Sequence, residues 1–154
     1  PDNELADTFS GILKQKKITA EKGYIIKVIG LIKERVCFIN EFWDQSYFLF
    51  QAPVDYDPNA LKKFWKDDTA NIIREISMLL KEANPFNSSV IENVVKNYTE
   101  QKNIGFGKVM NPLRIILVGS SFGPHLFDIM ELLGKEEVLK RIDNGVTALT
   151  QNRR

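Results

Sequence analysis

The sequence of 154 residues has few of the residues that build reactive or metal-binding sites. It contains one cysteine, Cys37, and one histidine, His125. Cys37 cannot form an internal disulfide, and its apolar helical surroundings favour a small core residue in a reducing, intracellular compartment over a reactive thiol. No HxxxH or CxxC pair is present, and a hydrolase triad would have to be built around His125 alone. We therefore expect no metal site and no catalytic site in this chain.

Several other features are also missing. The 21 Lys and Arg nearly balance the 20 Asp and Glu, so the net charge of +1 does not indicate nucleic acid binding, and any RNA contact must be a local patch. No apolar run approaches the roughly 18 residues of a membrane span. The Gly105 to Gly107 turn lacks the GxxxxGK[ST] spacing of a phosphate-binding loop. The chain begins at Pro1 without a signal segment, so we expect a piece of a longer polypeptide.

The residues that are present predict an all-α fold. Apolar residues recur at helical spacing, as in Ile25, Ile29, Ile32 and Val36. We expect seven or eight helices. They run approximately from Glu4 to Lys14, Ala20 to Val36, Pro58 to Lys66, Ala70 to Ala83, Ser89 to Lys102, Lys108 to Val118, Pro124 to Leu133 and Lys135 to Leu149.

Helix starts are indicated at three places. Ser89 and Glu92 have the spacing of a capping box, in which the two side chains satisfy unpaired amides of the first turn. Thr19 is a plainer N-cap candidate. Asp57 precedes Pro58, and proline is tolerated at the first helical position because its missing amide proton is not needed there.

Helix ends and a domain boundary can also be predicted. Gly119 and Gly134 each follow an apolar run and can take the left-handed conformation that ends a helix. Residues 115–118 also suit a buried strand, but their length and the lack of partner strands favour a helix. The turn-rich break formed by Ala52-Pro53 and Asp55 to Pro58 predicts two helical subdomains, 1–53 and 54–154.

The most informative segment is Gly107 to Ile142, GKVMNPLRIILVGSSFGPHLFDIMELLGKEEVLKRI. A Gly-Lys turn is followed by Pro112-Leu113-Arg114, which opens an apolar helix ending at Gly119. Gly123-Pro124 then leads to a second helix, which closes on Leu133-Gly134-Lys135-Glu136. In this pattern the segment resembles the C-terminal anticodon-binding region of bacterial glutamyl-tRNA synthetases. The resemblance extends back through Leu31 to Pro53 and Trp65 to Asp68, whereas the HIGH-like and KMSKS-like motifs of the catalytic half are absent.

The resemblance implies the helical anticodon-binding domain of a class I aminoacyl-tRNA synthetase, acting in the cytoplasm. The parent would be a glutamate–tRNA ligase that uses ATP and magnesium at a site outside this chain, and the chain itself would need no cofactor. Its partners would be the anticodon loop of tRNA for glutamate and the catalytic domain of the same polypeptide, but neither DNA nor a membrane. The alternative is a helical protein–protein interaction domain, which predicts no salt-sensitive RNA binding.

Arg114 is the first candidate for RNA binding. A charge among apolar residues is costly unless it is paired or reaches solvent. Arg114 could pair with a carboxylate or extend its guanidinium to the surface. It could equally present its five donors to base edges or phosphate. The resemblance places this arginine in the anticodon site and favours the second explanation.

The loop that leads into the second helix supplies four more candidates, Gly123, Pro124, His125 and Leu126. A helix N-terminus attracts anionic groups, Gly123 lets the backbone approach RNA closely, and Pro124 fixes the turn. His125 is expected in the first turn, where it could contact RNA or be an exposed capping residue. The resemblance places this loop against anticodon bases.

The remaining candidates have simpler alternative explanations. Arg35 lies near a helix C-terminus, where the helix dipole stabilises any cation, but the resemblance assigns the matching arginine to distinguishing C from G at the last anticodon base. Lys102 and Lys108 could contact phosphate, although exposed lysines are usually only solvated. The aromatic residues between Phe42 and Phe50 could stack on bases but are expected to pack in the core.

Overall fold

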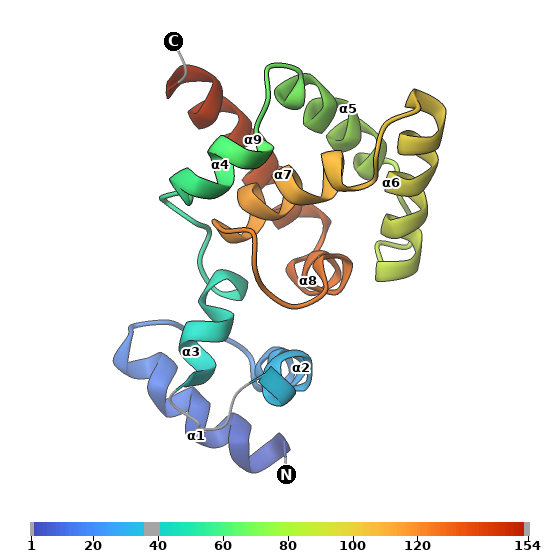
Figure 1. Ribbon diagram of the computed structural model, residues 1–154. Coiled ribbons are helices and arrows are strands. Elements are labelled where there is room, and N and C mark those ends of the chain that lie inside the picture. The colour runs from blue at the N-terminus through green and yellow to red at the C-terminus, as the bar shows by residue number, and fades with distance from the viewer. Residues whose placement is uncertain (1, 36–40, 153–154) are drawn as a thin grey trace. The chain divides into compact units, whose positions relative to one another are not determined.

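The computed structural model describes residues 2–35 and 41–152, and every regular element in this part of the chain is a helix (Figure 1). The α-helices are α1 (Asp2–Gln15), α2 (Lys22–Ile32), α3 (Glu41–Ser46), α4 (Pro58–Phe64), α5 (Thr69–Lys81), α6 (Ser88–Lys102), α7 (Gly107–Val118), α8 (Leu126–Leu133) and α9 (Lys135–Asn152). Two 3-10 helices, η1 (Lys33–Arg35) and η2 (Tyr47–Leu49), extend α2 and α3. The predicted all-α fold is confirmed. None of the described helices is long and apolar enough to cross a membrane.

Helices α3 and α7 differ from what the sequence pattern suggested. The sequence did not indicate α3, because a helix of six residues contains too few turns to show a periodic apolar face. Helix α7 begins at Gly107, so Pro112 lies inside the helix rather than opening it. Residues 115–118 are helical, as predicted. Val36, the predicted end of α2, and Cys37 lie outside the described residues.

The capping box predicted at Ser89 is wrong. Helix α6 begins at Ser88, and the residue before it, Asn87, accepts a hydrogen bond through Oδ1 from the Val90 amide at 2.9 Å. Asparagine is as good an N-cap as serine. Because the chain enters the helix earlier than a box starting at Ser89 requires, Ser89 lies inside the first turn.

Of the other two predicted helix starts, the one at Thr19 is wrong and the one at Asp57 is confirmed. Helix α2 begins at Lys22 after Glu21, whose side chain makes no capping hydrogen bond, so the N-cap predicted at Thr19 is wrong. Asp57 caps α4 as predicted. Its carboxylate accepts a hydrogen bond from the Asn59 amide at 3.0 Å, and Pro58 occupies the first helical position.

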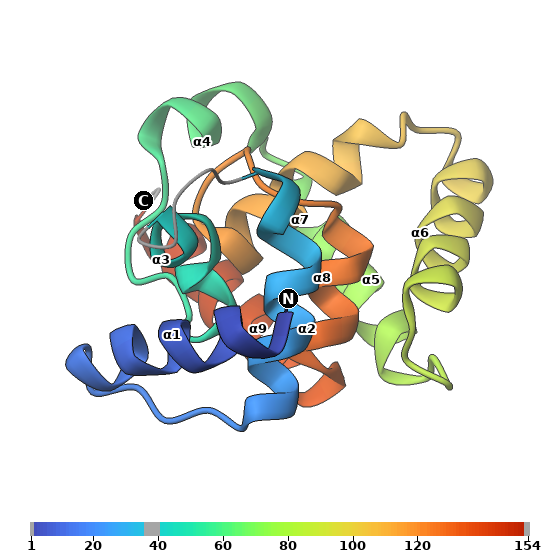
Figure 2. The ribbon, with the colours of Figure 1, turned by 90° about the horizontal axis from the view of Figure 1, so that it is seen from below.

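The chain divides into two compact units, Pro1–Gln51 and Ala52–Arg154. The assignment of residues 1–53 and 54–154 to separate subdomains stays a prediction. In the first unit, α1 crosses α2 (Figure 2) and the aromatic residues fill the space beside them. The Phe9 ring lies 5.8 Å from Phe42 and 5.9 Å from Phe50, and Tyr24 donates a hydrogen bond to the Leu49 carbonyl at 2.5 Å. Phe42 and Phe48 are core residues, as expected, whereas Tyr47 is 38% exposed.

In the second unit α7 contacts α4, α5 and α9, which surround it in Figure 1. Its residues Ile115, Ile116 and Leu117 are fully buried. A helix that is apolar on all sides must be covered on all sides, which explains why the run at 115–118 resembles a buried strand in sequence but folds as the central helix. The central position of α7 gives a rigid base to the loop that follows it.

Gly145 marks the closest approach of α9 to α7. A Cβ atom at this position would lie 2.9 Å from Ile116 Cγ2 and 3.3 Å from the Tyr56 hydroxyl. Alanine normally stabilises a helix by about 1 kcal/mol relative to glycine, but here it overfills a packed core, at a cost of about 1 to 3 kcal/mol. Gly30 in α2 is exposed, and a Cβ there would meet nothing within 4 Å.

We therefore expect Gly30→Ala to raise the free energy of unfolding and Gly145→Ala to lack this gain, with a difference of about 1 to 3 kcal/mol between the two effects. Urea unfolding of both variants and the parent measures this difference. Equal stabilisation by the two substitutions would show that α7 and α9 are not closely packed at Gly145.

Candidate functional site

Arg114 joins the end of one helix to the start of the next. It lies in α7 with its side chain half-buried, and its guanidinium donates a hydrogen bond through Nη1 to the Pro124 carbonyl at 2.7 Å. The bond spans the loop 119–125, which connects α7 to α8. Arg114 and the predicted loop residues are therefore brought together. The arginine positions the loop backbone, a role that the two explanations drawn from the sequence did not include.

Gly119 fixes the start of this loop. Its φ of +93° is left-handed, its amide donates to the Ile115 carbonyl at 2.7 Å, and the predicted helix end is confirmed. Its carbonyl accepts from the Asp57 amide at 2.9 Å, and a Cβ would lie 3.1 Å from that of Pro53. Gly134 also ends its helix with a positive φ of 85°, but its ψ of 158° is extended, so the predicted left-handed helical conformation is wrong there.

The interior of the loop is a tight turn with an exposed aromatic residue. The Ser120 hydroxyl contacts the Phe122 amide at 3.4 Å and its carbonyl at 3.3 Å. Gly123 has a φ of 142°, a conformation that favours glycine. Helix α8 begins at Leu126 rather than at Pro124 as predicted. The Pro124 carbonyl is bound by Arg114, and the next residue, His125, still has an extended ψ of 124°.

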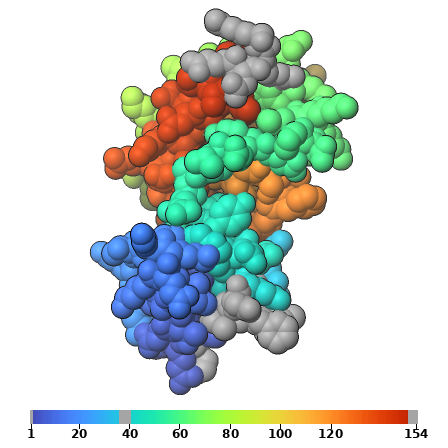
Figure 3. All heavy atoms as spheres, turned by 90° about the vertical axis from the view of Figure 1, so that its left-hand side faces the viewer, coloured from blue at the N-terminus to red at the C-terminus, as the bar shows by residue number. Residues whose placement is uncertain are grey.

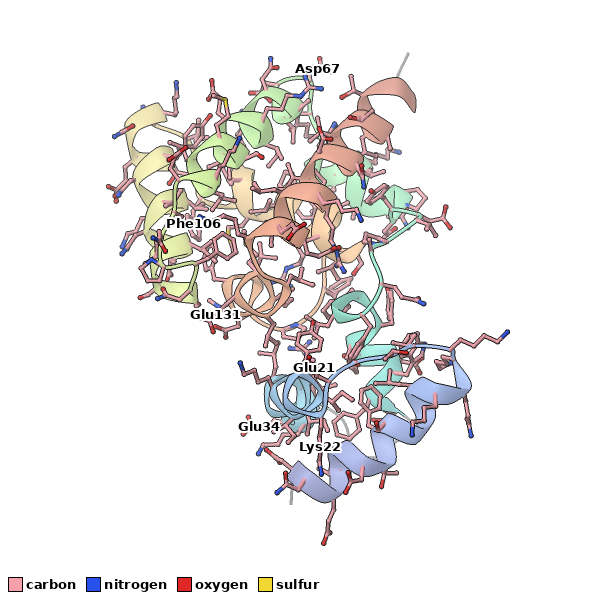
Figure 4. All side chains as sticks on the ribbon, turned by 180° about the vertical axis from the view of Figure 1, so that it is seen from behind. Glu21, Lys22, Glu34, Asp67, Phe106 and Glu131 are labelled. Carbon is pink, nitrogen blue, oxygen red and sulfur yellow. The ribbon has the colours of Figure 1, made fainter. Side chains whose placement is uncertain are left out.

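His125 is accordingly the N-cap residue of α8 and does not lie in its first turn, which corrects the prediction. Its side chain is 54% exposed, with Nδ1 3.6 Å from Asp128 Oδ2, and its ring lies edge-on to Phe127 with centroids 5.4 Å apart. Phe106, labelled in Figure 4, packs on the same Phe127 at 6.0 Å. Leu126 is fully buried, so its side chain supports the loop from the core and only its backbone can contact RNA.

Arg141 is a functional candidate that the sequence did not indicate. It is only 3% exposed, its Nε donates to Glu137 Oε2 at 2.7 Å, and its Nη1 donates to the Leu117 carbonyl at 2.9 Å. The last carbonyls of a helix have no partner inside the helix, and a cation there also suits the helix dipole. Arg141 therefore caps the C-terminus of α7, two residues before the loop begins. A Glu–Arg pair four residues apart normally indicates an exposed helix face, which is why sequence reasoning missed it.

The two candidate phosphate ligands lie beside carboxylates. Lys108 Nζ is 2.7 Å from Asp68 Oδ2, and this hydrogen bond holds the pKa of Asp68 below its usual range. Lys102 Nζ is 4.0 Å from Glu75 Oε2 and lies over the Tyr98 ring. Burial, with the Glu75 hydrogen bond, raises the pKa of Tyr98 to about 12. Both lysines are exposed, so a phosphate would have to compete with these carboxylates.

Arg35 belongs to the other compact unit. It is exposed and ends η1, which places it at a helix C-terminus, as the sequence indicated. The structure thus unites Arg114 with the loop from Gly123 to Leu126, whereas Arg35 belongs to the first unit.

The second unit also contains a pocket. A pocket of about 570 Å³ lies between α4 and α9, which are neighbours on the face shown in Figure 3. Its lining is mainly apolar and includes Tyr56, whose pKa is raised by burial and lowered in part by the Arg141 charge. Across residues 2–35 and 41–152, no group of three or more His, Cys, Asp or Glu side chains is placed to hold a metal ion.

This helical architecture matches a known protein family. The family model for the anticodon binding domain matches residues 4–146. The chain belongs to this family. The resemblance seen in the α7–α8 segment therefore extends over almost the whole chain.

Relatives of the anticodon-binding domain are named glutamate–tRNA ligase. The protein from Christiangramia forsetii is 49% identical over 149 residues, which are 96% of this chain and 30% of that protein. A solved glutamate–tRNA ligase from Elizabethkingia meningosepticum has a TM-score of 0.91 at 34% identity, over 97% of this chain and 30% of that one. The glutamate–tRNA synthetase structure from Elizabethkingia anophelis has a TM-score of 0.84 at 32% identity, and the match covers 96% of this chain and 29% of that one. The chain thus spans about 30% of the length of these relatives.

Proposed function

We propose that this domain binds the anticodon loop of tRNA for glutamate as the C-terminal part of a glutamate–tRNA ligase. The family and the names of the relatives support the general role. The observation that carries the proposal is the loop 119–125, which is fixed at one end by Arg141 on the Leu117 carbonyl and at the other by Arg114 on the Pro124 carbonyl.

A fixed loop suits the recognition of single-stranded RNA. Ordering flexible segments on binding costs free energy, and a loop that is already ordered avoids much of that cost. Unpaired anticodon bases can be splayed out and contacted on their edges and faces. In this role Gly123 allows close approach of the backbone, and the exposed His125 forms the surface that meets the bases. Pro124 and Leu126 are both buried, so their side chains anchor that surface in the core.

Arg114 has two parts in this proposal. It holds the Pro124 carbonyl, and its permanent positive charge lies beside the loop, where it favours the approach of RNA. Lys102 and Lys108 are proposed as weaker contacts to phosphate, formed in exchange for Glu75 and Asp68.

The chemistry of the parent enzyme lies outside this chain. Aminoacylation needs ATP and magnesium, and the described residues offer neither a phosphate-binding loop nor an acidic cluster that fits them. The domain is proposed to contribute selectivity and orientation, acting with the catalytic domain of the same polypeptide in the cytoplasm. Correct docking of the anticodon would help place the acceptor end in the distant active site.

The affinity of the chain for an RNA stem-loop tests the proposal. A dye-labelled anticodon stem-loop of tRNA for glutamate is titrated with the chain at two salt concentrations, with a stem-loop of scrambled loop sequence as control. We expect the chain to prefer the anticodon stem-loop over the scrambled control. The affinity should fall as the salt concentration rises, because contacts between cationic side chains and RNA phosphates release counterions. A helical protein–protein interaction domain would bind neither RNA in a salt-sensitive way.

The proposed role of Arg35 gives a separate prediction. We propose that the Arg35 guanidinium donates hydrogen bonds to acceptor groups on the edge of the last anticodon base. Arg35→Gln should then change the selectivity between C and G at this base more than the overall affinity for RNA. We expect the preference for a stem-loop whose anticodon ends in C over one whose anticodon ends in G to fall about tenfold. This corresponds to a difference in binding free energy on the order of 1 to 2 kcal/mol. Lys33→Gln, a charge removal in the same 3-10 helix, is the matched control. Unchanged selectivity in Arg35→Gln would remove Arg35 from the site.

A further inference from the structure

Phe122 is the exposed aromatic residue of the loop 119–125. Its side chain is 76% exposed, whereas Phe106 is 38% exposed and Phe127 only 1%. Phe106 and Phe127 also contact each other, but Phe122 takes part in none of the ring contacts found among the described residues. Core packing, which explains most aromatic residues of this chain, does not explain Phe122.

The backbone on both sides of Phe122 is held in place. The Ser120 hydroxyl contacts both the amide and the carbonyl of Phe122, and Gly119 and Gly123 supply the positive φ angles that the turn needs. Two residues further on, the Pro124 carbonyl is bound by Arg114. An aromatic ring on an ordered turn presents a flat apolar face at little additional cost in conformational entropy.

We infer that Phe122 is a stacking platform for an unpaired base of the anticodon loop. This inference rests on the proposed function and adds to it a stacking contact with the face of one base, made by a residue outside the segment from Gly123 to Leu126. Stacking of a base on an aromatic ring accepts any base, because every base has a π face. Phe122 therefore contributes affinity and holds a base in place, while selectivity comes from other residues.

The chemistry of this surface favours RNA over a protein partner as the occupant. A protein interface needs a continuous buried patch, whereas Phe122 is an isolated exposed phenyl ring two residues before Pro124, whose carbonyl accepts a hydrogen bond from the Arg114 guanidinium. An aromatic ring on a loop that an arginine also contacts is a combination that suits single-stranded nucleic acid, which is bound by stacking and by positive charge.

The test compares Phe122→Ala, Phe122→Leu and Phe122→Trp in stem-loop titrations. Stacking predicts a loss of affinity of about 5- to 100-fold for alanine, a loss of similar size for leucine, and affinity close to the parent for tryptophan. The slope of affinity against salt should stay unchanged in Phe122→Ala, since the ring releases no counterions. Because Phe122 is exposed, all three variants should keep the parent's thermal stability, which circular dichroism checks.

RNA variants that each lack one anticodon base identify the base that stacks on Phe122. Stem-loops lacking one base at each anticodon position in turn are titrated with the parent and with Phe122→Ala. At one position the two proteins should bind equally, because the base that stacks has been removed. Affinity of Phe122→Ala within about twofold of the parent, or full affinity of Phe122→Leu, overturns the stacking role while leaving the proposed function intact. Failure of the parent chain to bind any anticodon stem-loop overturns the proposed function and this inference with it.

Discussion

Replacing Arg141 by methionine is expected to lower the free energy of unfolding by about 1 to 3 kcal/mol, the cost of leaving a buried carbonyl without its charged hydrogen-bond donor. Methionine fills much of the space left by arginine, so the loss comes from polar groups rather than from a cavity. The Leu117 carbonyl, in a residue that is fully buried, loses its hydrogen bond. Glu137 loses its partner as well, but it is 35% exposed and can turn to water.

The neighbouring Lys140 provides the control. It lies on the same helix and is exposed, so Lys140→Met removes one positive charge without uncapping α7 and should change stability by less than about 0.5 kcal/mol. Glu137→Gln should cost about 1 kcal/mol, since it keeps an acceptor for Arg141. Urea unfolding of the three variants measures the ranking. If Arg141→Met were as stable as Lys140→Met, Arg141 would not be the cap that fixes the start of the loop.

Arg114→Gln is expected to weaken binding of the anticodon stem-loop by about 1 to 3 kcal/mol. The substitution removes the charge beside the loop and the hydrogen bond to the Pro124 carbonyl. Because this bond comes from a charged donor, stability should also fall, by about 1 to 2 kcal/mol. The salt dependence of binding should decrease by about one counterion.

Arg114→Lys separates the two contributions. Lysine keeps the charge but lacks the planar fork, so we expect the salt dependence of the parent with only part of its affinity. Stability and stem-loop affinity are measured on the same preparations. Wild-type RNA affinity in folded Arg114→Gln, combined with a clear loss of stability, would make Arg114 a purely structural residue and contradict its place in the RNA site.

Local signals in the sequence predicted much of this fold. The stop at Gly119 and the start at Asp57 were correct because each depends on one residue and its immediate neighbours. The starts proposed at Thr19 and Ser89 were wrong because several polar residues near each helix could cap it, and tertiary packing selects among them.

The candidate site was only partly accessible from sequence. The segment from Gly107 to Ile142 identified the loop and Arg114, but the burial of Leu126 and the contact between Arg114 and Pro124 depend on the packing of α7 and α8. The role of Arg141 depends on α9 meeting the end of α7, a contact between positions 24 residues apart. No local pattern encodes such a contact.

Nuclear magnetic resonance of the isotope-labelled chain can test directly whether the loop 119–125 is the RNA-binding surface. The anticodon stem-loop of tRNA for glutamate is added stepwise, and amide shifts are followed across the chain. We expect the amides of Gly119, Phe122, Gly123 and His125 to shift most, while those of Met78 and Leu79 on the exposed side of α5 stay unchanged. Shifts that spare the loop 119–125 and concentrate elsewhere on the chain would contradict this expectation.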